Sequence, residues 1–309
     1  QLIMIEKNMK YQLVSIFILL SVLFTGCGGP TSLDAGAVIT TTASESTTTA
    51  EATTITKSET GVSTSVPETN KPKVDTEKST EEKLEPTTTK KGKLVAHYID
   101  VGQGDSIFIE LPQGECMLID AGESRYGSTV VKYIKDKGYL KVDYLIATHP
   151  HSDHIGGLTE VIQSLDIGTI YMTNAVHTTR TYENLLAAIK DKGKKMKRAK
   201  VGVEIISTKN VKASFVAPAS DSYSDLNDYS AIVRLDHGKK SFLFMGDATT
   251  KSESEITANI SVDVLKVGHH GSSTSSSEDF LNQTKPKVAI ISCGINNTYG
   301  HPNEDALKR

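Results

Sequence analysis

A dense group of metal-ligating side chains lies near the middle of the sequence. Three histidines and one aspartate fall within six residues: His149, His151, Asp153 and His154. They directly follow the apolar run at 144–147, whereas the whole chain of 309 residues has only nine histidines. Imidazole and carboxylate groups gathered so closely are typical ligands of Zn²⁺ and related cations. The pattern therefore predicts a metal site, and a solvated histidine-rich loop explains it less well.

Further residues of the same types lie at the ends of other apolar runs. Asp120 follows one run directly, while Asp247 and the pair His269 and His270 each follow a run after a single glycine. An apolar run that ends in a polar residue is typical of a buried strand that presents a side chain at its end. Functional residues commonly lie on such loops of a rigid scaffold. We therefore expect these residues to join the turn at 149–154 at one edge of the core.

The elements that position these residues are expected to begin at Lys93. Strands are predicted at 94–100, 106–110, 116–119, 142–147, 169–172, 201–206, 213–217, 231–235, 241–245, 262–267 and 288–293. The spacing of apolar residues predicts helices at 128–139, 155–165 and 181–192, and weakly at 251–260. Runs of antiparallel strands with interspersed helices predict an α/β chain of the α+β kind, in which packed sheets are covered by helices.

Several short motifs accompany the histidine turn. The HxHxDH motif at 149–154 is followed by two glycines, and with Asp120 upstream and Asp247 and His270 downstream it resembles the metallo-β-lactamase fold of metallo-hydrolases. Further motifs are DVGQGDS at 100–106, NDYS at 227–230, FMGDA at 244–248, LKVGHHGS at 265–272 and YGHP at 299–302. They resemble the extracellular domain of ComEC, the competence DNA-uptake channel. The resemblance covers 93–309 and implies a four-layer αββα sandwich with a binuclear metal site.

The resemblance also implies which residues bind the cations. One cation would be held by His149 and His151, and the other by Asp153, His154 and a histidine of the 269–270 pair, with Asp247 bridging both. His270 is favoured for that place because it precedes Gly271, as the ligand of the superfamily does. His269 would then face the substrate or act as the alternative ligand.

Three residues are candidates for a catalytic role: Asp120, Asp153 and His301. Asp120 is expected to orient a ligand or the metal-bound water. His301 could donate a proton to the leaving group or hold a phosphate oxygen. A buried or capping histidine beside Pro302 fits the sequence equally well.

The chain departs from the superfamily at one ligand. The superfamily usually offers another histidine between the HxHxDH turn and the bridging aspartate, but His177 comes too early and His237 belongs to a hairpin turn. The NDYS sequence occupies the expected place, so Asn227 is a candidate substrate contact or alternative ligand. The first cation is therefore expected to be the more weakly held. Zn²⁺ suits the imidazoles, while the oxygen donors keep Mn²⁺ open.

Two adjacent cations indicate a hydrolase. They would acidify a shared water and offset negative charge on the attacked group, which suits a phosphodiester, with DNA as the first candidate. A phosphoester of the cell envelope and a non-catalytic DNA-capturing lipoprotein are the alternatives. The resemblance to the ComEC branch makes a β-lactamase the weaker interpretation, and nothing points to a protein partner.

A basic run at 190–200 carries seven positive charges in eleven residues. Such a run is usually the solvated end of a helix. Beside a hydrolytic site it could bind a nucleic-acid backbone through Lys194, Lys195, Lys197, Arg198 and Lys200. The formal net charge of −3 for the whole chain does not favour nucleic acid by itself.

The sequence before the folded region predicts where the protein is located. A short apolar stretch behind Lys10 ends in Phe24-Thr25-Gly26-Cys27, which resembles a bacterial lipobox with Cys27 as the lipidated residue. We expect a signal peptide at 1–27, a disordered linker rich in Thr, Ser, Glu and Lys at 28–92 and a hydrolase domain at 93–309, whose C-terminus is expected to be truncated. The protein would be lipid-anchored on the extracellular side of the cell membrane, or secreted.

Overall fold

The computed structural model describes residues 2–6 and 92–309. Most of the predicted signal peptide, with Cys27, and the predicted linker up to residue 91 lie outside these residues. Leu2–Glu6, within the range of the predicted signal peptide, form strand β1. The boundaries 1–27, 28–92 and 93–309 stay predictions.

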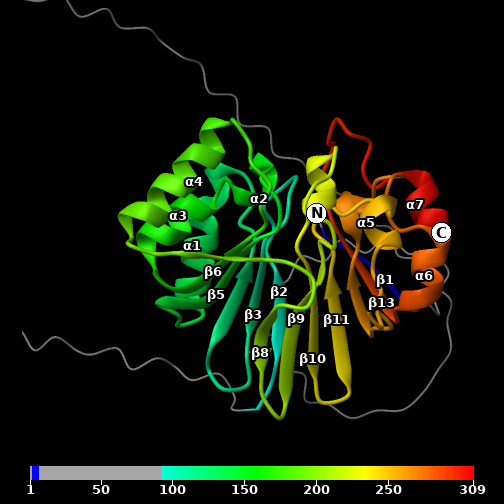
Figure 1. The fold of residues 1–309 in the computed structure, drawn as a ribbon, viewed down its shortest axis with the longest axis horizontal. Coiled ribbons are helices and arrows are strands. Elements are labelled where there is room, and N and C mark those ends of the chain that lie inside the picture. The colour runs from blue at the N-terminus through cyan, green and yellow to red at the C-terminus, as the bar shows by residue number, and fades with distance from the viewer. Residues whose placement is uncertain (1, 7–91) are drawn as a thin grey trace, which may run out of the picture. The chain divides into compact units, whose positions relative to one another are not determined.

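Two mixed β-sheets form the centre of the fold (Figure 1). The first contains, in spatial order, β2 (Val95–Tyr98), β3 (Ile107–Glu110), β4 (Cys116–Ile119), β5 (Lys141–Ala147), β6 (Asp166–Met172) and β7 (Met196–Arg198). The second contains β1, β13 (Val288–Ser292), β12 (Val264–Lys266), β11 (Lys240–Phe244), β10 (Ile232–His237), β9 (Val211–Ala217) and β8 (Glu204–Ser207). Each sheet thus joins an antiparallel part to a parallel part.

Helices cover the outer face of each sheet (Figure 1). The first sheet carries α1 (Gly127–Asp136), α2 (Ser152–Ile155), α3 (Leu158–Ser164) and α4 (Arg180–Asp191). The second carries α5 (Thr250–Ser254), α6 (Glu278–Thr284) and α7 (Glu304–Lys308). Three short 3₁₀ helices, η1 (Ser124–Tyr126), η2 (Leu226–Tyr229) and η3 (Gly268–Gly271), lie in loops.

Three separate groups of buried apolar side chains hold these layers together. One packs α1, α3 and α4 on the first sheet, a second lies between the two sheets, and a third packs α6, α7 and the segments that flank α5 on the second sheet. Strand β3 shows how the sequence achieves this, because Phe108 faces the helices while Ile107 and Ile109 face the other sheet. Strands buried on both faces are apolar throughout rather than alternating. The predicted four-layer αββα sandwich is confirmed.

Some predicted elements differ in detail. The helix expected at 155–165 is divided into α2 and α3 at Gly156 and Gly157. Gly157 passes so close to the loop after β4 that a Cβ atom there would lie 2.2 Å from the Ala121 carbonyl oxygen, so a larger residue would not fit. Strand β7 and helix α6 were not predicted. The sheets were expected to be antiparallel, yet β4 to β7 and β11 to β13 run parallel.

The parallel pairing decides where the polar strand ends meet. The carboxyl ends of parallel strands lie at one edge of a sheet, where α/β proteins commonly bind ligands. Asp120 follows β4, His149 follows β5, Asp247 follows β11 and His270 follows β12. The two sheets thus bring these four residues to a common edge.

Candidate metal centre

The histidine turn lies between β5 and α2. His151 is the residue before α2, with extended backbone, and its carbonyl oxygen accepts hydrogen bonds from the N–H groups of His154 and Ile155 at 3.1 and 3.0 Å. This change from strand to helix gathers three imidazoles. The ring centroid of His149 lies 4.7 Å from that of His151 and 4.2 Å from that of His154.

Four of the predicted ligands form a tight group. Asp153, His154, Asp247 and His270 each offer a donor atom, and these atoms all lie within 4.8 Å of one another. Asp247 Oδ2 is 3.2 Å from Nε2 of both His154 and His270, and His270 Nε2 is 3.4 Å from Asp153 Oδ2. Ligand atoms around a tetrahedral Zn²⁺ lie roughly 3.3 Å apart, given metal–nitrogen distances of about 2.0–2.1 Å. The group therefore fits a divalent cation.

Two further histidines adjoin this group. His149 Nε2 is 3.0 Å from His151 Nδ1 and 3.9 Å from Asp247 Oδ2. The remaining oxygen, Asp247 Oδ1, is buried and has no hydrogen-bond partner among the described residues. A buried carboxylate oxygen is costly to leave without a partner. This donor set would suit the two cations that the resemblance implies, with Asp247 as a carboxylate within reach of both sets of histidines.

Asp120 orients the His154 imidazole through Nδ1, the ring nitrogen that does not face Asp247. It is fully buried, and its backbone has the left-handed φ of 57°. Its Oδ2 accepts a hydrogen bond from His154 Nδ1 at 2.8 Å and one from the Thr148 hydroxyl at 2.6 Å, and its Oδ1 accepts from the Thr148 N–H at 2.9 Å. Burial raises the pKa of Asp120, and these hydrogen bonds oppose the rise. A carboxylate that holds the far nitrogen of a ligating histidine is typical of metal sites.

The other ligand rings are held in the same way. His270 Nδ1 donates to the carbonyl oxygen of Ser292 at 2.8 Å. His149 Nδ1 lies 3.0 Å from the Thr148 hydroxyl oxygen and 3.5 Å from that of Ser230. Because Thr148 donates its own proton to Asp120, its oxygen is available to accept from His149. The Nε2 atoms of both rings are left to face Asp247.

The charges of the group stabilise one another. Although burial lowers the pKa of His154, the nearby carboxylates of Asp247 and Asp153 raise it well above its usual value. Burial likewise opposes the rise at His270, whose pKa reaches about 9 beside Asp247. Burial raises the pKa of Asp247, yet His154 and His270 hold it well below its usual range. Burial and the neighbouring His154 keep His149 neutral by lowering its pKa. Metal ligation needs neutral imidazole, so a cation competes with the protons of His154 and His270.

A buried ion pair lies against this group. Lys266 Nζ is 2.7 Å from Asp105 Oδ2, and the side chains are 0% and 2% exposed. Asp105 Oδ1 lies 3.6 Å from His270 Nδ1, and the N–H of Asp105 donates to the Asp153 carbonyl at 3.3 Å. The pair thus fixes the loop after β2 against two of the candidate ligands. Sequence analysis missed it, although a lysine inside the apolar run at 262–267 signals a buried carboxylate partner.

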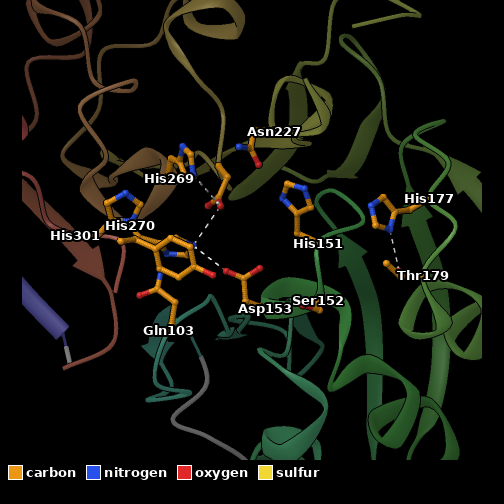
Figure 2. A pocket seen from close by; sticks show the side chains of 12 residues that line it. Gln103, His151, Ser152, Asp153, His177, Thr179, Asn227, His269, His270 and His301 are labelled. Atoms are coloured by element: carbon orange, nitrogen blue, oxygen red, sulfur yellow. Dashed lines mark hydrogen bonds and ion pairs between the residues drawn. The ribbon is translucent and has the colours of Figure 1, made fainter. Parts of the chain in front are cut away.

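An open cavity of about 300 Å³ adjoins the ligand group (Figure 2). It is lined by Gln103, His151, Ser152, Asp153, His177, Thr179, Asn227, Asp247, His269, His270, Tyr299 and His301. Gln103, Thr179 and Tyr299 were not singled out from the sequence. A solvent-accessible cavity over buried ligands gives a substrate a route to the site.

The structure brings His269 and His301 to one wall of this cavity. Their ring centroids lie 5.4 Å apart, and His269 Nε2 is 4.0 Å from Asp247 Oδ2. Burial lowers the pKa of His301, and the adjacent His269 and His270 lower it further, so the ring is neutral near pH 7. His237 lies outside the cavity and is the last residue of β10 rather than part of the hairpin turn, and its Nδ1 is 3.0 Å from the Asn210 carbonyl oxygen.

The basic run lies outside the cavity as well. Met196–Arg198 form edge strand β7, so this part of the run is not the end of a helix. Arg198 and Lys200 both pair with Asp221, at 2.8 and 3.0 Å, and Lys194 lies 3.7 Å from Asp166. Among the described residues that line the cavity, none belongs to this run. Nucleic-acid binding by Lys194, Lys195, Lys197, Arg198 and Lys200 stays a prediction.

Residues 99–295 match the family model of the Metallo-beta-lactamase superfamily. The chain belongs to this superfamily. ComE operon protein 3 of Bacillus subtilis is 30% identical to it over 230 residues, covering 68% of this chain and 30% of that protein. Recombination protein 2 of Haemophilus influenzae is 31% identical over 217 residues, covering 68% of this chain and 26% of that protein. This metallo-β-lactamase domain is thus ComEC-like, and it spans less than a third of either relative.

Solved structures show a more distant likeness. CmlA, a diiron β-hydroxylase from Streptomyces venezuelae, is 15% identical with a TM-score of 0.37, over 58% of this chain and 35% of that one. A likeness at this level carries no information about the reaction.

The buried ion pair leads to a prediction about stability. We expect Lys266→Met to lower the free energy of unfolding by about 3–5 kcal/mol, because it leaves the carboxylate of Asp105 buried without its cation. Equilibrium unfolding of the full metallo-β-lactamase chain in urea measures the change. Lys287→Met is the matched control, since Lys287 Nζ is 2.6 Å from Asp263 but its side chain is 73% exposed. Equal effects of both substitutions would contradict the structural role of the buried pair.

Proposed function

We propose that this protein is a metal-dependent phosphodiesterase that acts on DNA. The observation that carries the proposal is the carboxylate of Asp247, which lies between two sets of candidate ligands beside an open cavity. Members of the superfamily are usually metal-dependent hydrolases, and the candidate site has the donors that such chemistry needs. The names of the relatives, a recombination protein and a protein of the ComE operon, support DNA as the polymer.

Individual residues of the chain would have separate roles in such a reaction. When bound, two divalent cations supply an acidified water and offset the charge of the phosphodiester. Asp120 keeps the proton of His154 on Nδ1, so that Nε2 stays directed at the metal side. His301 is a neutral ring on the cavity wall and can donate one hydrogen bond to a phosphate oxygen. Of the two functional roles left open by the sequence, this one suits a neutral ring better than protonation of the leaving group.

Tyr299 supports a nucleic acid over other phosphodiesters. Its side chain lines the cavity although the residue is 69% exposed, and its ring stacks on that of His301 at 5.7 Å and 23°. An exposed aromatic face beside a reaction site is a typical platform for a base. A sugar- or glycerol-based envelope polymer has no flat ring to place there.

The proposal includes a membrane tether through lipidated Cys27, with the domain on the extracellular side of the membrane. Its support is the lipobox-like sequence at 24–27 and the low-complexity stretch that follows. Within residues 2–6 and 92–309, no helix is both long and apolar enough to cross a membrane.

The metal-dependent reaction is tested by removing ligands. We expect Asp247→Ala and His151→Ala each to abolish hydrolysis of single-stranded DNA, because the first removes the shared carboxylate and the second a ligand of one cation. Chelator should abolish the wild-type activity, and added Zn²⁺ or Mn²⁺ should restore it. Nuclease assays at fixed ionic strength provide the measurement.

The control is His237→Ala, which removes a partly exposed imidazole at the end of β10, outside the cavity, and should leave the rate unchanged. Cleavage retained in both ligand variants would contradict the assigned site. Wild-type protein that binds DNA and hydrolyses nothing would instead indicate a capture module.

The exposed ring of Tyr299 leads to a separate prediction. We expect Tyr299→Ala to raise KM for single-stranded DNA by about 5- to 150-fold, which corresponds to the loss of about 1–3 kcal/mol of stacking on one base. Hydrolysis of a glycerophosphodiester should be unaffected. Steady-state kinetics on both substrates, with Tyr299→Phe as the variant that keeps the ring, provide the measurement. Equal losses on both substrates would contradict a role in base recognition and favour an envelope substrate.

A further inference from the structure

Among the described residues, three that line the cavity have a buried side-chain atom without a hydrogen-bond partner: Asn227 Oδ1, Asp247 Oδ1 and His301 Nδ1. Of these, only the amide oxygen of Asn227 has no role in the site so far. Asn227 is 7% exposed and lines the cavity, and its Oδ1 atom forms no hydrogen bond with any of the described residues. Figure 2 shows the Asn227 amide directed toward the interior of the cavity, on the side of His151. A buried amide oxygen left without a donor is costly, so its position calls for a ligand.

The backbone around Asn227 is held firmly. Its N–H donates to the Asp225 side chain at 2.9 Å, and its carbonyl accepts from the N–H of Ser230 at 3.0 Å, so η2 is closed at both ends. The Ser230 hydroxyl in turn accepts from the N–H of Asp247 at 3.0 Å and lies 3.5 Å from His149 Nδ1. This short helix therefore carries the amide of Asn227, and Ser230, the residue directly after it, contacts two candidate ligands.

The two sets of ligands differ in their number of donors. With Asp247 counted in both, the first set has four donors (Asp153, His154, Asp247 and His270), whereas the second has three (His149, His151 and Asp247). A tetrahedral zinc site has four ligand positions. The second set is one donor short of that number, and Figure 2 shows the unpartnered amide on the side of His151.

His177 is the other residue that could complete this set. Its ring lies 6.2 Å from that of His151 and lines the cavity. However, its Nδ1 already pairs with the Thr179 hydroxyl at 2.9 Å, and the residue is half-exposed. A half-exposed imidazole can hydrogen-bond to water, whereas the buried Asn227 oxygen cannot. Of these two residues, Asn227 is therefore the one whose buried atom needs a ligand.

We propose that Asn227 Oδ1 is a protein ligand of the cation held by His149 and His151. A neutral amide oxygen is a poorer ligand for Zn²⁺ than imidazole and a better match for Mn²⁺. The site at His149 and His151 is thus the weaker of the two and the less selective for zinc. The proposal rests on the metal dependence proposed above and adds a ligand and an order of loading to it.

Metal titration of the full chain tests this assignment without reference to activity. Metal-free protein is titrated with Zn²⁺, and separately with Mn²⁺, by calorimetry, and the stoichiometry is checked by elemental analysis. For wild type we expect a tight and a weak Zn²⁺ event. Asn227→Ala should weaken the second event by at least about tenfold and leave the first unchanged. Asn227→His should tighten the weak Zn²⁺ event, because it supplies the missing imidazole.

Asn282→Ala is the matched control, since this asparagine is exposed on α6, away from the cavity lining. It should leave both events unchanged. If Asn227→Ala keeps both wild-type affinities, or if a folded Asn227→His gains nothing at the weak event, the assignment of Asn227 is wrong while the metal-dependent function stands. If wild type binds no metal, the proposed function fails first and this inference fails with it.

Discussion

The site depends on one buried carboxylate that is shared between the two sheets. Asp247 is 2% exposed, and its Oδ2 lies 3.2 Å from Nε2 of both His154 and His270 and 3.9 Å from that of His149. A buried carboxylate is unfavourable unless positive groups or a cation surround it. Those groups come from both sheets, since His149 and His154 follow β5 whereas Asp247 and His270 follow β11 and β12. The ligand group therefore exists only when the sheets are packed together.

The sequence reveals the ligands because each of them follows a buried strand. An apolar run that ends in histidine or aspartate can be identified without any knowledge of tertiary contacts, as at Asp120 and Asp247. The four layers were implied by the resemblance to the superfamily, whereas the residues alone predicted packed sheets covered by helices. The structure shows the physical basis, since strands such as β3 and β4 are buried along their whole length and are covered on both sides. The apolar runs do not indicate whether neighbouring strands are parallel or antiparallel, so the parallel pairing of β4 to β7 was missed.

Contacts between distant segments were beyond the reach of sequence patterns. The pairing of Lys266 with Asp105 joins the last residue of β12 to the loop between β2 and β3 of the other sheet. The local sequence of one segment does not identify the other as its partner. The fold also places an acidic partner beside the basic run at 190–200. As sequence it is a block of positive charge, but Asp221 from another loop pairs with both Arg198 and Lys200. Surface charge therefore has to be judged after such pairs are known.

The two sets of ligands are also connected through hydrogen bonds to Asp120. Asp120 accepts a hydrogen bond from His154 directly, and through the Thr148 hydroxyl it also reaches Nδ1 of His149. One carboxylate thus orients a ring on each side of Asp247. This explains why a fully buried aspartate with a raised pKa and left-handed backbone is tolerated at this position. Its desolvation is opposed by the hydrogen bonds that it accepts from His154 and Thr148, so the contacts that stabilise Asp120 are the same ones that orient a ring in each set of ligands.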